Sequence, residues 1–484
     1  MANVVKEKKL SYWIHSVIVV LLIFGFGMIE PFGSLEKVGM QVLGIFIGLL
    51  YGWTFIGFIW PSLLGLMALG FTEYTNINGA ITQGFGDASI TVFVFFIFIF
   101  AAYLEHIGLS AQIANWFISR KVVIGRPWLF TFFVLLVTYI LGATVSQTAG
   151  IVLMWAIFYN VCEVVGFKKG DLYPTVMLIA IVFASMLGFA VFPFKVLQVM
   201  TLGSLESVSG IKADFIDFTA ISFLISIGSL ALFMVVFRFL IRPDISPLKT
   251  NTDHFAHLRG QKLSKEQKLG ALFLALFMIG MFAPSFMPEN NKLGQILSHL
   301  GTTGILIVII LILAFLKIDG KPVFVFSEAV KGVNWDLIIM FAATMPVSHA
   351  MSDPEVGVMN FIVDLFEPLF NGMNSTMFII VFILVSGLLT QVAHNLVLGA
   401  LFTPIAYSFA IDLGANPILV VTLLTFALQV AIATPGGSST GALIYVNREW
   451  IDVKSAYKYS CMVASINLLA VILVGIPIGH LIYG

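Results

Sequence analysis

The sequence predicts an all-α polytopic membrane protein with inverted repeats: about 11 transmembrane helices, two re-entrant helical hairpins and two broken helices. Of the 484 residues, 59% are hydrophobic and 10% are charged, whereas about a quarter of an average soluble domain is charged. Apolar runs close to or above the ~18 residues that mark a membrane span recur from Ile14 to Tyr483. Two of these runs contain a polar cluster, and each is followed by a run interrupted at proline.

The apolar runs place the individual elements. Single spans are expected near residues 14–30, 39–53, 54–71, 90–107, 216–241, 269–286, 303–318, 335–350 and 457–482. We divide the chain into N-terminal scaffold helices (1–89), a first repeat (90–241), a cytoplasmic linker (242–268), further scaffold helices (269–331) and a second repeat (332–484). The linker is too short and too polar to build a core of its own.

The distribution of basic residues predicts the orientation. The first apolar run, 14–29, lacks a small-residue cleavage site, so it is expected to be a retained span. When the N-terminus is placed inside, all but four of the 25 Lys and Arg residues fall on the inner side. Basic residues in short loops favour the cytoplasmic face. We therefore expect a multi-pass protein of the cytoplasmic membrane, with a cytoplasmic N-terminus and an extracytoplasmic C-terminus.

Two segments, 128–163 and 376–411, are predicted to enter the membrane and return. Each arm of the first has about 14 apolar residues and would reach ~20 Å, short of the ~30 Å hydrocarbon layer. Its centre reads ATVSQTAG, and the centre of the second reads QVAHN. By the charge distribution the two hairpins enter from opposite faces, so each polar cluster is expected at a hairpin tip near mid-membrane.

A span broken at proline follows each hairpin. The first, 174–203, contains Pro193 and Lys195, and the second, 417–446, contains Pro435 followed by two glycines. Proline removes a backbone donor, and a helix interrupted at membrane depth leaves polar backbone groups that are tolerated only beside a cavity or ligand. Inverted repeats with discontinuous helices are typical of secondary transporters. Helix N-termini at such breaks favour an anion, while freed carbonyl groups favour a small cation.

Four stretches resemble the divalent-anion:sodium symporter family, in the ion-transporter superfamily of elevator-type carriers. They are FVFFIFIFAAYLEHIGLSAQIANWFISR (93–120), ATVSQTAGIVLMWAIF (143–158), NLVLGALFTPIA (395–406) and QVAIATPGG (429–437). The resemblance covers the chain from about Val38 to its end. It implies a homodimer that moves a small dicarboxylate or related anion with sodium, the hairpins and broken helices moving against a fixed scaffold.

The chain departs from that family at each motif. The family carries Ser-Asn-Thr at each tip and a Thr-Pro-Pro-Asn-like turn in each broken helix. Here the tips are Ser146-Gln147-Thr148 and His394-Asn395-Leu396, and the turns are Phe192-Pro193-Phe194-Lys195 and Thr434-Pro435-Gly436-Gly437. These departures leave open a smaller or less charged anion, an exchanger, a proton-coupled carrier, or a citrate-metal or arsenite-type relative of the same superfamily.

The tips and turns supply the candidate site residues. The expected substrate-binding residues are Ser146, Gln147, Thr148, Lys195, His394, Asn395, Thr434, Pro435, Gly436, Gly437 and Ser438. The expected sodium ligands are Thr144, Ser146, Gln147, Gly188, Gln391, Asn395 and Ala433. Sodium is the only metal ion expected, as the coupling ion, and no cofactor or nucleic acid is expected.

Two candidate residues allow more than one interpretation. Lys195 either takes the place of a bound sodium ion, as a fixed charge opposite the anion, or extends to the outer interface. His394 either contacts the substrate or carries a coupled proton, or it is a neutral residue bonded to the hairpin backbone.

Two rival classes are less favoured. The Gly84-Phe85-Gly86-Asp87 stretch matches a short motif of intramembrane aspartyl proteases, but the spans offer no facing aspartate, and no enzyme is expected. Channels also use re-entrant loops, although an inverted pair of broken helices favours alternating access over an open pore.

Overall fold

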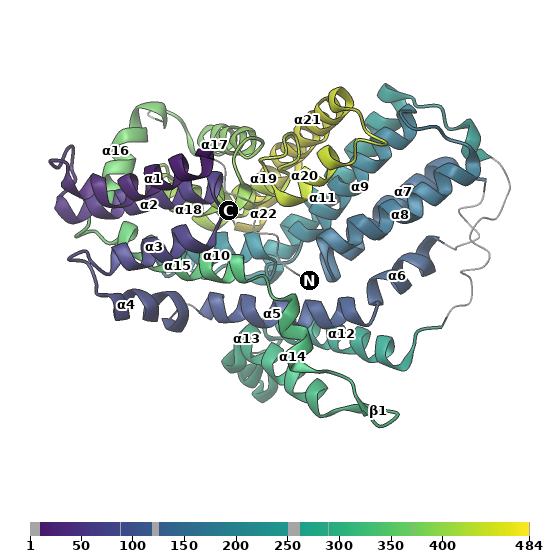
Figure 1. Ribbon diagram of the computed structural model, residues 1–484, viewed down its shortest axis with the longest axis horizontal. Helices are drawn as coiled ribbons and strands as arrows, with labels where there is room; N and C mark the ends of the chain where they lie inside the picture. Colours follow the sequence, from purple (N-terminus) through teal and green to yellow (C-terminus); the bar gives the residue numbers. More distant parts are fainter. Residues whose placement is uncertain are drawn as a thin grey trace.

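The computed structural model describes residues 10–87, 89–118, 125–249, 262–288, 290–370 and 372–483 (Figure 1). Within these ranges it is helical apart from a small antiparallel hairpin, β1 (Lys317–Ile318) and β2 (Lys321–Pro322). Ten of the described helices are long and apolar enough to cross a membrane, or up to 12 if each of two bent pairs is one span. The predicted class, an all-helical membrane protein, is confirmed. The N-terminal lysines and part of the expected linker, 250–261, lie outside the described residues.

The N-terminal helices form one group with helices from the second half. They are α1 (Leu10–Gly25), α2 (Lys37–Phe55), α3 (Ile59–Leu69) and α4 (Ile77–Ile81). The helices α1, α2 and α3 pack on one another, and α3 also packs along α15 (Trp335–Ser352). The expected span over 54–71 is wrong in extent, because Gly57, with a φ of 137°, separates α2 from an α3 of 11 residues.

The first repeat holds the first hairpin and the first broken helix. Its helices are α5 (Ser89–His106), α6 (Leu109–Ile118), α7 (Pro127–Thr144), α8 (Gln147–Val165), α9 (Leu172–Ala190), α10 (Val196–Ser209) and α11 (Phe215–Val235). The predicted interruption at Pro193 is confirmed, since α9 ends at Ala190 and α10 begins at Val196.

The arms of the first hairpin are longer than expected. They have 18 and 19 residues instead of about 14, because α7 extends through the polar Thr144 and α8 starts directly at Gln147. Each arm could therefore reach about 27 Å, and length alone does not make this hairpin re-entrant. The tip lies beside the broken helix: Ser185, in the last turns of α9, donates to the main-chain oxygen of Gln147 at 3.0 Å.

The second half repeats the arrangement. Its helices are α12 (Lys265–Phe286), α13 (Lys292–Phe315), α14 (Phe326–Ala329), α15, α16 (Val358–Phe370), α17 (Ser375–Leu389), α18 (Asn395–Asp412), α19 (Pro417–Gln429), α20 (Ser439–Val446), α21 (Val453–Ala470) and α22 (Ile476–Tyr483). Two expectations need correction. The span expected over 303–318 starts at Lys292 and kinks at Gly301, with a φ of 61°, and α16 was not expected.

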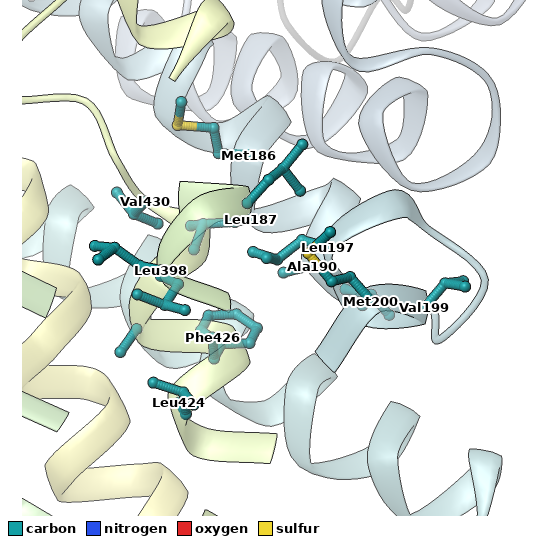
Figure 2. Close-up of a cluster of buried hydrophobic side chains, with 14 of the residues drawn as sticks. Met186, Leu187, Ala190, Leu197, Val199, Met200, Leu398, Leu424, Phe426 and Val430 are labelled. Atoms are coloured by element: carbon teal, nitrogen blue, oxygen red, sulfur yellow. The ribbon is translucent and has the colours of Figure 1, made fainter. Parts of the chain in front are cut away.

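The two repeats share a core. Helix α10 packs against α18 and α19, which also pack on each other. Figure 2 shows the buried cluster between them, in which Leu197 and Met200 of α10 lie near Leu398 of α18 and Phe426 of α19. Helix α10 begins directly after the first break, and α19 ends directly before the second. This shared core therefore places the two breaks beside each other.

Two glycines bring α7 and α9 into close contact. A Cβ atom on Gly188 would lie 1.9 Å from the carbonyl oxygen of Tyr139, and one on Gly142 would lie 2.3 Å from that of Ser185. Small residues at such positions permit the close helix packing that stabilises membrane proteins. The first hairpin arm is therefore held directly against the backbone of the first broken helix.

We predict that Gly188→Ala lowers the melting temperature of the purified protein, because the added methyl group must displace the α7 backbone. Overpacking of this kind costs about 1–3 kcal/mol. Gly25→Ala is the matched control, since a Cβ there meets nothing within 4 Å. Equal melting temperatures for the two variants would contradict the close packing of α7 on α9.

Candidate solute-binding site

Four helices begin at one cavity of about 340 Å³, which we call the central cavity. The helices are α8, α10, α18 and α20, and the residue that precedes each of them lines the cavity: Ser146, Lys195, His394 and Ser438. Two of these helices follow hairpin tips and two follow breaks. The structure thus brings together, from both repeats, the polar positions singled out in the sequence.

Most of the expected substrate-binding residues line the central cavity. Those that do are Ser146, Gln147, Thr148, Lys195, His394, Asn395 and Ser438, and Ser439 and Thr440 join them. Thr434, Pro435, Gly436 and Gly437 are not among its lining residues. They form the turn behind it, where the carbonyl oxygen of Gly437 accepts from the backbone N–H of Asn395 at 2.9 Å. Their expected contact with substrate stays a prediction that this cavity does not support directly.

Helix α10 differs from the other three in its first turn. The side chains of Ser146, His394 and Ser438 each accept a hydrogen bond from a backbone N–H of the helix they precede, at 3.3, 3.3 and 2.9 Å. Lys195 precedes α10 and makes no such bond, because an ammonium group has no acceptor. Helix N-termini carry about half a positive charge. The first amides of α10, at the cavity wall formed by Val196 and Leu197, are thus left available to an anion.

Lys195 is 7% exposed and lines the central cavity. Its Nζ lies 5.2 Å from the ring centroids of both Phe189 and Phe194. The ion pairs found among the described residues join other lysines to acids, and none includes Lys195. A lysine at membrane depth is expensive unless it has a partner, and two aromatic faces supply only part of one. Lys195 is thus an almost fully buried residue of the cavity wall.

The first hairpin tip connects the two repeats. The side-chain nitrogen of Gln147 donates to the hydroxyl of Thr440, in α20, at 3.4 Å. Thr144 instead donates to the carbonyl oxygen of Ile140 in its own helix, at 2.7 Å. Of the residues expected to hold sodium here, Ser146 and Gln147 therefore face the cavity, whereas the hydroxyl hydrogen of Thr144 is used within α7.

The second hairpin tip is bonded to the second break through Gln391. Its Oε1 accepts from the backbone N–H groups of Ile432 and Ala433 at 3.1 and 2.9 Å, and its Nε2 donates to the carbonyl oxygens of Gly387 and Val430, both at 2.9 Å. Its main-chain oxygen accepts from the hydroxyl of Thr434. The side-chain oxygen of Gln391 thus already accepts two hydrogen bonds, and its expected role as a sodium ligand stays a prediction.

The backbone groups of two other expected ion ligands, Ala433 and Gly188, are already in contact with other parts of the protein. The carbonyl oxygen of Ala433 accepts from the hydroxyl of Tyr445, and Gly188 is needed for contact with Tyr139. Within the described residues, no group of three or more His, Cys, Asp or Glu side chains could hold a metal ion.

The sequence reasoning missed part of the cavity wall. Phe98 and Glu105 of α5, Phe189 of α9 and Gln429 of α19 also line it. Gln429 is 2% exposed, and its Oε1 accepts from Nε2 of the fully buried Gln198 at 3.1 Å. A lone acid or amide within an apolar run was the available signal for Glu105 and Gln429. The aromatic residues gave none, because phenylalanine is common throughout the chain.

A multi-pass helical protein whose broken helices and hairpin tips meet at one cavity has the architecture of a secondary transporter. The model of the citrate transporter family, CitMHS, matches residues 3–395. The chain belongs to that family, and so to a transporter family rather than an enzyme family. The expected superfamily is confirmed, but within it the citrate transporters, one of the alternatives, are the family shown.

Two further comparisons agree with a transporter. The chain is 26% identical over 119 residues to an uncharacterized transporter, sll0640, of Synechocystis sp.; the match covers 25% of this chain and spans about a fifth, 19%, of that relative. The fold is similar to that of the YdaH transporter of Alcanivorax borkumensis, described as having an unusual topology. That similarity has a TM-score of 0.53, 14% identity, and covers 83% of this chain and 86% of the other.

We predict that Gln391→Ala lowers the melting temperature by the same amount with and without sodium. The substitution removes bonds that hold the second break and leaves buried backbone groups unpaired, at about 1–3 kcal/mol each. The measurement is thermal unfolding in detergent, in sodium chloride and in choline chloride. A sodium ligand would behave differently, since wild type and variant would then converge when sodium is removed.

Proposed function

We propose that this protein carries a small carboxylate anion, citrate or a related di- or tricarboxylate, across the cytoplasmic membrane by alternating access. The observation that supports this most directly is the meeting of four helix N-termini with Lys195 at one cavity. The partial positive charges of the helix N-termini and the Lys195 side chain favour an anion at the cavity wall, where Glu105 is the one acidic residue among the described lining residues. The cavity volume of about 340 Å³ lies within the range of small-molecule sites.

Lys195 is proposed to pair with one carboxylate of the substrate. Its ammonium group lies at the start of α10, so one carboxylate group could accept from Nζ and from the open amides of the first turn together. The bonds from Gln147 to Thr440 and from Gln391 to the second break hold the surrounding wall in place. The fixed charge is then supplied by the protein and does not have to be brought by an ion.

His394 is proposed to donate to the substrate as a neutral imidazole. Its Nδ1 accepts from the backbone N–H of Leu396, so in the neutral ring Nε2 carries the hydrogen. Phe58 packs edge-on against the ring, with centroids 5.4 Å apart. This arrangement favours a substrate contact over the role of a coupled proton carrier.

Sodium coupling is retained as a second proposal. It rests on the oxygen atoms of Ser146, Gln147 and Thr148 at the cavity wall, because hard cations prefer oxygen ligands. The alternative is that Lys195 takes the place of a sodium ion at the first repeat. The orientation with the N-terminus inside and the homodimer implied by the resemblance also remain predictions.

We predict that Lys195→Met abolishes saturable uptake of labelled citrate into proteoliposomes, because the cavity loses its full positive charge. Lys265→Met is the matched control, since Lys265 lies at the surface with an exposed ion pair to Asp319 and lines none of the described cavities. Equal expression and melting temperature of the two variants would show that folding is intact. Full uptake by Lys195→Met, with unchanged affinity, would remove Lys195 from the substrate site.

The same assay tests the coupling ion. If sodium is coupled, replacement of external sodium by choline stops concentrative uptake by the wild type. If Lys195 takes the place of sodium, uptake continues in choline, and exchange of internal for external anion is faster than net uptake.

We predict that the pH profile of uptake between pH 6 and pH 8, the region where an ordinary histidine titrates, is the same in the wild type and in His394→Gln, because His394 acts as a neutral donor. His394→Gln keeps a donor and should retain measurable uptake, whereas His394→Ala should raise KM. A steep pH profile that disappears in His394→Gln would instead indicate a proton-carrying role.

A further inference from the structure

A second hollow approaches the substrate site from the other end of the molecule. This far cavity, of about 500 Å³, is lined by Phe93 of α5, Pro193 and Phe194 of the first break, residues of α10 from Val199 to Glu206, the loop from Lys212 to Phe215, and residues of α12 and α13 that include Ser285 and Thr302. Phe194 also lines the central cavity. One side chain is therefore shared by the two hollows.

The two cavities lie toward opposite ends of the same helices. In α5, Phe93 lines the far cavity and Glu105 lines the central cavity, about 18 Å further along the helix. Glu105 also lines a vestibule of about 490 Å³, whose wall includes Glu266 in the first turn of α12. Ser285, in the last turn of α12, lines the far cavity, about 28 Å from Glu266 along the axis.

Phe194 lies in an aromatic layer between these hollows. It is 3% exposed, and its ring stacks on Phe192 with centroids 5.3 Å apart and an interplanar angle of 11°. It also meets Phe277 of α12 edge-on, at 5.3 Å and 74°. Phe192 in turn lies 6.3 Å from Phe282 of α12. The layer therefore runs from the first break to a helix outside the hairpins and breaks.

Phe194 lies in a non-helical stretch of backbone, where a change of side-chain position does not have to break a helix. It lies between α9 and α10, directly after Pro193, where the backbone is not held in a helix. It directly precedes Lys195, whose Nζ lies over its ring at 5.2 Å. A carboxylate that pairs with Lys195 competes for the ammonium group that this ring contacts. Occupation of the site can thus alter the contacts of Phe194.

We propose that Phe194 is the barrier residue of the transporter: in this structure its ring separates the substrate cavity from the far cavity, and its displacement from Phe277 joins them. The inference rests on the proposed transport through the central cavity. In this proposal the Phe194 side chain alone keeps the central cavity and the far cavity apart. Hydrophobic constrictions of this kind close pores by excluding water.

The test measures access and transport separately. Cys461, the exposed native cysteine, is replaced by serine, and Thr302→Cys places a thiol in the far cavity. In otherwise wild-type protein, a small membrane-impermeant thiol reagent should label this introduced thiol from the far-cavity side alone. In Phe194→Ala the reagent should label it from both sides, and trapped citrate should leak from proteoliposomes severalfold faster.

The matched control is Phe183→Ala, a fully buried ring that packs on Phe233 and lines neither cavity. It should keep one-sided labelling. If Phe194→Ala does not fold, Phe194→Leu and Phe194→Cys take its place, and a thiol introduced by Phe194→Cys should react from both sides. One-sided labelling together with unchanged leakage in the folded variants would overturn the proposal. Labelling does not depend on which solute is carried, so failure of the barrier is distinguishable from failure of the proposed substrate.

Discussion

The constraint on which this structure depends is that a backbone interrupted inside a bilayer must find partners for its polar groups. Water is absent there, and an unpaired amide or carbonyl group costs several kcal/mol. The chain interrupts four helical segments, at two tips and two breaks. The second hairpin tip satisfies the second break: Gln391 accepts from the amides of Ile432 and Ala433 and donates to the carbonyl oxygen of Val430. The hairpins are thus as much a support for the broken helices as a wall of the cavity.

This constraint also explains how much the sequence could predict. Hydropathy, prolines and polar tips were sufficient for the class, the two hairpins and the two breaks, because each is a local departure from an apolar helix. They also selected Ser146, Lys195, His394 and Ser438, the residues that precede the four converging helices. The length of the arms was misjudged, since Thr144 and Gln147 are polar and were counted outside helices that in fact include them.

The other differences between the expected site and the central cavity are matters of tertiary contact. Thr434 to Gly437 resemble a binding motif in sequence. In the structure this turn is hydrogen-bonded to the second hairpin tip, through Thr434 to Gln391 and through Gly437 to Asn395. Gln391 is an oxygen-bearing residue at a tip, which is what a sodium ligand would be. In the structure its side chain is hydrogen-bonded to the backbone of the neighbouring break. The α5 wall could not be assigned, because nothing in a run rich in phenylalanine distinguishes a ring that faces a cavity from one that faces lipid or core.

The two breaks have similar positions relative to the hairpin tips, but their backbone groups have different hydrogen-bond partners. At the second, protein groups satisfy the backbone: Gln391 joins the turn to the tip, and Asn395 donates to Gly437. At the first, the helix that follows has no side-chain cap, and a buried lysine without an ion pair among the described residues stands before it. An anion there would pair with the ammonium group and cap the helix at once. Only the first break is left for a solute to complete. This arrangement suits one bound anion rather than two equivalent ligands. The two breaks thus share their arrangement, and the difference between them is the uncapped start of α10 beside Lys195.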